Sequence, residues 1–124
     1  MIEWLRKVCL DLPYTTEQIQ WGDHLLFKIG GKMYAARSVE PARQGVSFKC
    51  SPEEFAELIE VPNIIPAPYL ARAHWVALET DDALPRTELK KRITRSYEMV
   101  LSGLTKKAQA ALAAPPSKPK TKRA

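Results

Sequence analysis

The residues of this chain that could do chemistry are mainly dispersed cations, together with one aromatic pair. Two lysines flank the Gly-Gly pair of FKIGGKMYAA, residues 27–36, a third lies in SFKC, and an arginine precedes a His-Trp dipeptide. Lysine and arginine neutralise phosphates, and exposed aromatic rings stack on nucleobases. The candidate nucleic-acid contacts in the body of the chain are therefore Lys28, Lys32, Lys49, Arg72, His74 and Trp75. The alternative for His74 and Trp75 is a half-buried aromatic pair at the start of a strand.

The excess of positive charge lies at the C-terminal end. The chain has 19 basic and 14 acidic residues, and six of the basic ones but none of the acidic ones lie in residues 104–124. The remaining 13 basic residues are nearly balanced by the 14 acidic ones, so the body is close to neutral. The ending PPSKPKTKRA cannot pack a core, and we expect a disordered arm that either contacts phosphates or only aids solubility. The cations of this arm are Lys118, Lys120, Lys122 and Arg123.

Metal and catalytic chemistry have weaker support. His24 and His74 are the only histidines, and neither belongs to a carboxylate or thiol cluster at ligand spacing. Glu53, Glu57 and Glu60 lie around one predicted helix, where they form either a site for a hard cation or an ordinary solvated surface. No segment resembles a nucleophile turn. We therefore expect neither an enzyme nor a bound cofactor.

The cysteines and the N-terminal segment indicate a compartment. Cys9 and Cys50 have no ligand spacing, and we interpret both as buried thiols in a reducing environment. The start MIEWLRKVCLDLP contains charged residues, so it is not a signal peptide. No apolar run approaches the roughly 18 residues that a membrane span requires. The sequence predicts a cytoplasmic protein that does not insert into a membrane.

Helices are predicted where apolar residues recur at helical spacing. One covers residues 2–12 and is stopped by Pro13. A second begins at SPEEFAELIE, where Ser51 can cap the helix and Glu54 can complete a capping box. A third runs from about 85 to Gly103, and a weak continuation is expected in KKAQAALAA. The apolar stripe of the third helix is Leu89, Ile93, Tyr97, Val100 and Leu104.

The charged face of this third helix holds the densest basic cluster of the body. We interpret it as a solvated surface, in which Glu88 pairs with Arg92 at i, i+4. The cluster is Lys90, Lys91, Arg92 and Arg95.

Strands are predicted where polar and apolar residues alternate. The proline-rich VPNIIPAPY predicts an irregular connection between the second helix and the last strand. Short strands with brief links favour an α+β domain, with an antiparallel sheet of about five strands and helices packed on one face. The predicted strands cover residues 17–21, 24–29, 33–38, 46–50 and 74–79.

The Gly-Gly hairpin has two alternative registers. A two-residue loop would place Phe27 across from Tyr34 and Ile29 across from Lys32. A three-residue loop would instead pair Ile29 with Met33 and Phe27 with Ala35, and we favour it because it gathers four apolar residues on one side. Lys28 would then point outward, where Arg37 and Lys49 could join it in a second patch.

Several short motifs, in order along residues 1–107, resemble the YjbR/MmcQ family of small bacterial proteins. The motifs are CLDLP, Trp21-Gly22, FKIGGKMYA, FKCSPEEF, His74-Trp75 and RSYEMVLSGLTKK. This resemblance implies a CyaY-like α/β fold with a "double wing" arrangement, in a family labelled DNA-binding. It divides the chain into a domain over residues 1–107 and a basic Ala/Pro/Lys-rich tail over residues 108–124.

The leading hypothesis is a non-enzymatic protein that binds DNA, or another nucleic acid, mainly through backbone phosphates. A second hypothesis is a protein-interaction module that presents the His74–Trp75 loop to a protein partner. The third is a frataxin-like metal binder that uses Glu53, Glu57 and Glu60.

Overall fold

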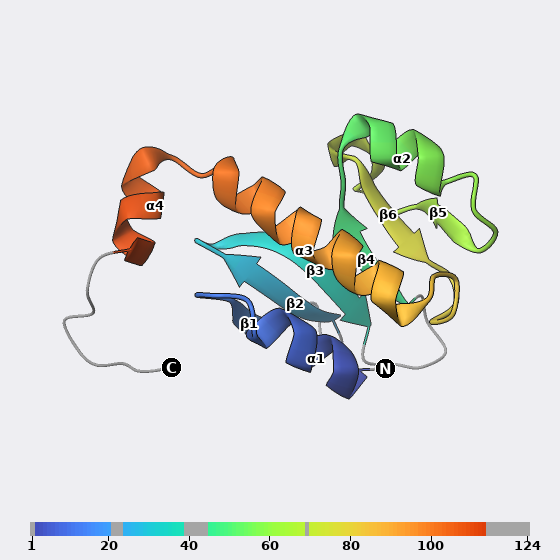
Figure 1. The fold of residues 1–124 in the computed structure, drawn as a ribbon, viewed down its shortest axis with the longest axis horizontal. Coiled ribbons are helices and arrows are strands. Elements are labelled where there is room, and N and C mark those ends of the chain that lie inside the picture. The colour runs from blue at the N-terminus through green and yellow to red at the C-terminus, as the bar shows by residue number, and fades with distance from the viewer. Residues whose placement is uncertain (1, 21–23, 39–44, 69, 114–124) are drawn as a thin grey trace.

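A computed structural model describes residues 2–20, 24–38, 45–68 and 70–113 (Figure 1). Helices and strands follow one another as α1 (Ile2–Leu10), β1 (Thr16–Gln20), β2 (His24–Ile29), β3 (Lys32–Ser38), β4 (Val46–Lys49), α2 (Pro52–Leu58), β5 (Ile64–Pro66), the 3₁₀ turn η1 (Ala71–Ala73), β6 (Trp75–Leu78), α3 (Arg86–Ser102) and α4 (Lys106–Ala113).

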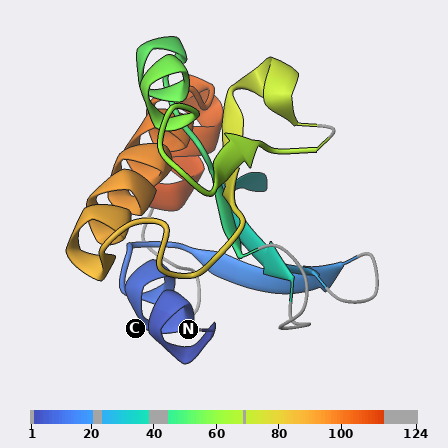
Figure 2. The ribbon, with the colours of Figure 1, turned by 90° about the vertical axis from the view of Figure 1, so that its right-hand side faces the viewer.

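The strands form one antiparallel sheet in the order β1-β2-β3-β4-β6-β5. The helices cover one face of it, as Figure 2 shows. The predicted α+β class and the one-sided helix layer are confirmed. In the described ranges no helix is long and apolar enough to cross a membrane.

The sheet has six strands rather than about five, because the proline-rich segment contains β5. Ile64 faces Leu78 and Pro66 faces Val76 across the β5–β6 pair. The strand lies at the edge of the sheet, where a proline is tolerated because its missing N–H has no neighbour to bond. Three residues are also too few to show an alternating pattern, so the sequence alone did not predict this strand.

The β2–β3 hairpin combines features of both predicted registers. Its tip has the two-residue loop, with Ile29 facing Lys32 and Lys28 facing Met33, so the predicted pairing of Ile29 with Met33 is wrong. A β-bulge then shifts the register, and Phe27 faces Ala35 as predicted. The register leaves Tyr34 as the extra residue of β3, and both Tyr34 and Ala35 contribute to the main core.

Next to this bulge, the buried side chain of Ser96 in α3 forms hydrogen bonds with one backbone group of β3 and one of β4. Its hydroxyl donates to the carbonyl of Tyr34 at 2.7 Å and accepts from the amide of Lys49 at 3.1 Å. Ser96 is fully buried, so no water replaces these bonds. The β3–β4 pairing ends at Ala35 and Phe48. Just past this point, the side chain of Ser96 connects α3 to both strands.

The main core fills the space between the sheet and the helices. The predicted stripe of α3 is buried in full, from Leu89 to Leu104. The rings of Tyr34 and Tyr97 meet edge to face at 5.4 Å, and Tyr97 donates to the carbonyl of Pro13 at 2.7 Å. These contacts hold the turn after α1 against α3.

The signals predicted at the helix ends agree with the structure. Ser51 accepts from the amide of Glu54, and Glu54 accepts from the amide of Ser51, which completes the capping box of α2. Gly103 ends α3 in a right-handed conformation (φ −85°), so its glycine character is not required by the backbone there.

The predicted domain boundary at 107 falls inside helix α4. Ala108 and Leu112 pack against the main core. The side-chain amide of Gln109 donates to the backbone carbonyls of Leu101 and Leu104. Residues 108–113 therefore belong to the folded domain. The remaining tail, 114–124, lies outside the described residues.

Candidate nucleic-acid interface

The strand register places two of the candidate lysines on the same face of the sheet. Phe27 and Phe48 belong to the helix-covered core, so their neighbours Lys28 and Lys49 point to the opposite face. Lys28 faces Met33 on β3, and Lys49 faces Trp75 on β6. Across β2, β3, β4 and β6 these residues form a row on the helix-free face, which we call the outer row: Lys28, Met33, Lys49 and Trp75.

The other two candidate cations lie at the same end of the strands. Lys32 is exposed at the hairpin tip, directly before Met33. Arg72 is exposed in η1, and the amine of Lys49 donates to the carbonyl of Ala73 in that turn at 2.8 Å. Antiparallel pairing therefore gathers Lys28, Lys32, Lys49 and Arg72 where β2 and β4 end and where β3 and β6 begin.

Strand residues on the helix-free face carry no acidic side chain within the described ranges. Their charged groups are the two lysines of the outer row, and their neutral polar groups include Gln18 and Ser47. The acidic side chains of α2 belong to the helix layer on the other face. A phosphate chain approaching the outer row would therefore meet cations without a facing carboxylate from the strands.

Arg37 does not join this surface, so its predicted place beside Lys28 and Lys49 is wrong. It faces Leu25 and Val46 on the helix-covered side, and only 6% of it is exposed. Its guanidinium binds both carboxylate oxygens of Asp81, at 3.0 and 2.9 Å. The arginine is therefore a buried link between β3 and the segment after β6.

In the His74–Trp75 pair, Trp75 is buried and His74 is half-buried. Trp75 is only 4% exposed and packs with Ala67 and Ala77, so its ring offers no stacking surface to a base. His74 has a left-handed backbone (φ 63°), and its ring meets Phe55 edge to face at 5.5 Å. This arrangement matches the half-buried aromatic pair that we considered as the alternative.

Two of the four cations in the basic cluster of α3, Arg92 and Arg95, are paired with carboxylates. Glu54 of α2 accepts from Arg92 at 2.9 Å and from Arg95 at 2.7 Å. The predicted pair of Glu88 with Arg92 is present at 2.8 Å, and Glu57 lies 3.6 Å from Arg92. The sequence did not predict that α2 supplies two of these partners, because the contacts join residues about 40 positions apart.

The same contacts determine the pKa of Glu54. Burial alone raises the pKa of this carboxyl, but the hydrogen bond from the Ser51 amide and the guanidinium groups of Arg95 and Arg92 outweigh it, so the pKa is lowered. Glu54 therefore stays ionised and joins α2 to α3.

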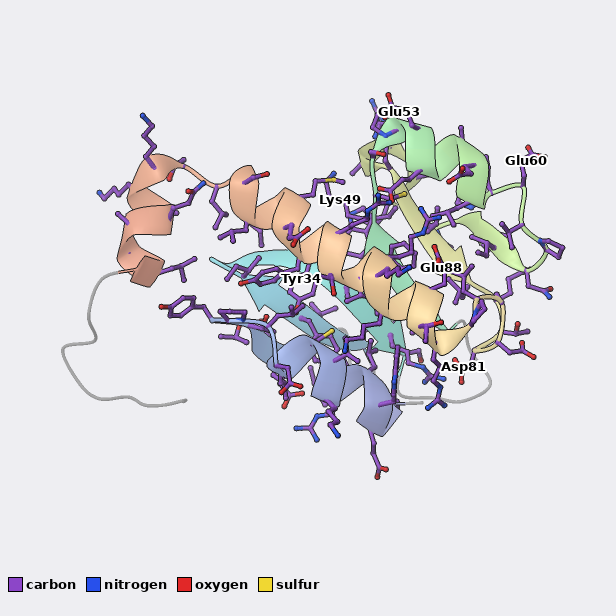
Figure 3. The ribbon with its side chains drawn as sticks, viewed as in Figure 1. Tyr34, Lys49, Glu53, Glu60, Asp81 and Glu88 are labelled. Atoms are coloured by element: carbon purple, nitrogen blue, oxygen red, sulfur yellow. The ribbon has the colours of Figure 1, made fainter. Side chains whose placement is uncertain are left out.

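The acidic residues proposed as metal ligands are not brought together. Glu53 and Glu60 lie at opposite ends of α2 in Figure 3, and Glu57 lies beside Arg92. Among the described residues no group of three or more His, Cys, Asp or Glu side chains is placed to hold a metal ion. The structure therefore does not support the metal-binding alternative.

Both thiols are buried, as predicted. Burial raises the pKa of Cys9 to about 12 and that of Cys50 to about 11. Each thiol is therefore protonated at neutral pH, and neither is prepared to act as a nucleophile.

The segment that leads to the basic tail packs near the cationic end of the sheet. A Cβ added to Gly30 at the hairpin tip would lie 2.6 Å from Cδ1 of Leu104, which shows how closely this segment approaches the tip. Lys106 and Lys107 follow on α4, and both are exposed. Lys118, Lys120, Lys122 and Arg123 lie outside the described residues.

Comparison with known proteins gives three similarities. The YjbR family model matches residues 10–99. The uncharacterized protein YbdF of Escherichia coli O157:H7 is 25% identical over 109 residues, which cover 86% of this chain and 89% of that protein. The crystal structure of Deinococcus radiodurans protein DR2400, with domain DUF419, has a TM-score of 0.79 and 32% identity, covering 93% of this chain and 89% of that one.

Proposed function

This chain belongs to the YjbR family, and we propose that it is a non-enzymatic DNA-binding protein that contacts backbone phosphates. The observation that carries the proposal is the convergence of Lys28, Lys32, Lys49 and Arg72 at one end of the sheet, on a face whose strands present no carboxylate in the described ranges. Phosphate contacts of this kind give affinity without base selectivity.

The roles of the four cations differ. Lys28, Lys32 and Arg72 supply phosphate contacts at the surface. Lys49 already donates to the carbonyl of Ala73, so its main effect is to add positive potential beside the turn that carries Arg72. Because Trp75 is buried, the proposed interface reads the backbone of a duplex rather than stacked bases.

The tail extends this interface. It follows α4, and the segment that precedes α4 touches the hairpin tip. A tethered arm contacts a bound polyanion at a high effective concentration. A protein partner at the His74–Trp75 loop is less favoured, because the larger of the two rings is inside the fold.

The proposal is tested by anisotropy titrations of a labelled 30-base-pair duplex over a series of salt concentrations. The double substitution K28Q/K32Q removes two expected phosphate contacts, so the slope of log K against log [salt] should become shallower by about 1.8, at ~0.9 per contact. Affinity at low salt should fall about tenfold or more.

The matched control is K90Q/K91Q, which removes the same charge from the exposed face of α3. It should leave affinity within about twofold, because α3 belongs to the opposite layer. The proposal is wrong if the full chain does not bind duplex DNA at low salt, or if the two double variants weaken binding equally.

A further inference from the structure

Exposed large apolar side chains occur in the chain segment from α1 to the edge strand β1. In the described part of the chain, the large hydrophobic side chains with high exposure are Leu10 (41%), Tyr14 (55%) and Ile19 (61%). They belong to the last residue of α1, the turn that follows, and β1.

The backbone of β1 is also available for pairing. β1 is an edge strand, and its five residues pair with β2 without a bulge. It contains neither proline nor lysine, which are the residues that commonly protect an edge. The opposite edge strand, β5, has only three residues and ends in Pro66. Among the described residues, no backbone hydrogen bond beyond those with β2 involves residues 16–20.

The turn before β1 is anchored by hydrogen bonds on both sides of Tyr14, whose side chain is exposed. Pro13 accepts a hydrogen bond from Tyr97, and the hydroxyl of Thr15 lies 2.9 Å from that of Tyr34. Between these anchors Tyr14 adopts a left-handed backbone (φ 64°), which is unfavourable for a residue other than glycine. The backbone that carries this exposed ring is therefore held between two anchored residues.

We propose that the β1 strands of two copies of this chain pair antiparallel about a two-fold axis at Ile19, joining the two sheets into one. This register places Ile19 opposite Ile19 of the partner subunit, and each Gln18 opposite Gln20 of the partner subunit. Apolar groups then meet apolar groups on the helix side, and amides meet amides on the other face.

A second copy of this chain suits the edge, because the two-fold axis at Ile19 pairs an isoleucine with an isoleucine and a glutamine with a glutamine. A two-fold axis at Gln18 would instead place the charged Glu17 opposite Ile19. The charges at the edge also permit self-association, because Glu17 is neutralised by Arg6 at 2.6 Å within each copy. This inference does not depend on DNA binding.

Sedimentation velocity of the full chain over a range of concentrations tests the pairing. The wild-type chain should shift from one to two chains per particle as its concentration rises. I19K should remain monomeric, since a lysine at this edge position prevents strand pairing. The control A110K adds the same charge on the exposed side of α4 and should dimerise like the wild type.

Monomeric wild-type protein at several hundred micromolar would overturn the proposal, as would equal dimer fractions for I19K and A110K. Circular dichroism should show that both variants fold, because Ile19 and Ala110 are exposed.

A cross-linking experiment tests the register. Facing residues of an antiparallel pair have Cα atoms ~4.5–5.5 Å apart, which suits a disulfide. With oxidised glutathione as the oxidant, two Cys side chains of I19C should form one intersubunit disulfide and release two reduced glutathione molecules. Q18C should cross-link far more slowly, because its two copies would be about 8 Å apart.

Faster cross-linking of Q18C than of I19C would overturn the proposed axis. The natural cysteines do not interfere, because Cys9 and Cys50 are buried, protonated thiols.

Discussion

At the scale of single residues, Glu54 has more structural roles than any other acidic residue of α2. It closes the capping box of its own helix and accepts hydrogen bonds from Arg92 and Arg95 of α3. Because its side chain is only 14% exposed, water competes weakly for these bonds. The residue therefore links a local signal, the helix start, to a tertiary contact.

The substitution E54Q should destabilise the protein by about 2 kcal/mol at neutral pH, the usual contribution of hydrogen bonds to a charged group. Glutamine still fits the capping box, so the loss reports the contacts with the arginines. Urea unfolding of both proteins measures the difference.

The pH dependence of this difference has a defined direction. The folded-state pKa of Glu54 lies below its ordinary value of 4.5, so the contribution is complete above that pH and disappears as pH falls through the folded-state pKa. The control E53Q changes an exposed carboxyl in the same turn and should cost only a few tenths of a kcal/mol. A difference between E54Q and wild type that persists at pH 2 would contradict this account.

At the scale of elements, the bulge in β3 determines how the sheet meets α3. It brings Tyr34 and Ala35 to the same core and turns Arg37 to the helix-covered side, whereas the two-residue loop at the tip already pairs Lys28 with Met33 on the outer face. Beside the bulge, the carbonyl of Tyr34 and the amide of Lys49 form hydrogen bonds with the hydroxyl of Ser96. One buried hydroxyl group therefore bonds the backbone of β3 beside the bulge and the backbone of Lys49.

The substitution S96A should lower the free energy of unfolding by about 1–3 kcal/mol, because it leaves the Tyr34 carbonyl and the Lys49 amide buried without a partner. The matched control is S102A, in which an exposed hydroxyl bound to the carbonyl of Met99 is lost. That change should cost less than about 0.5 kcal/mol. Equal effects of S96A and S102A in urea unfolding would show that the bulge does not need the hydroxyl.

At the scale of the whole molecule, the net charge of +5 and the neutral body imply that any polyanion is held by a local surface and by the tail. The folded domain brings four dispersed cations to one end of the sheet, and Leu104, which precedes α4, lies close to the hairpin tip at the same end. Long-range attraction from the rest of the molecule contributes little, because its charges are nearly balanced.

Deletion of residues 115–124 removes four cations and should therefore make the salt slope of duplex binding shallower by up to about 3.6, at ~0.9 per phosphate contact. Anisotropy titrations at several salt concentrations measure the slope, and thermal unfolding should be unchanged because the deletion begins after α4. A variant in which the four tail cations are replaced by glutamine keeps the length of the tail and should behave like the deletion. These cations are Lys118, Lys120, Lys122 and Arg123. An unchanged slope in both variants would show that the tail does not touch DNA.

The sequence by itself determined the features that depend on neighbours in the chain. The capping box at Ser51 and the apolar stripe from Leu89 to Leu104 both follow from residues one to four positions apart. Such signals are local, so they can be recognised in the sequence without knowledge of the fold. The short strands with brief links predicted the α+β class, and the motifs along the chain predicted the family, which the comparisons confirm.

Only the tertiary structure decided which side chains stay available for function. Trp75 and Arg37 look like surface candidates in the sequence, but the sheet buries the first and an ion pair with Asp81 holds the second. The two-residue loop at the hairpin tip places Met33 beside Lys28, and the bulge at Tyr34 then turns Arg37 to the helix-covered side. Contacts between distant segments set burial and register, and the alternation pattern of a single strand does not contain them.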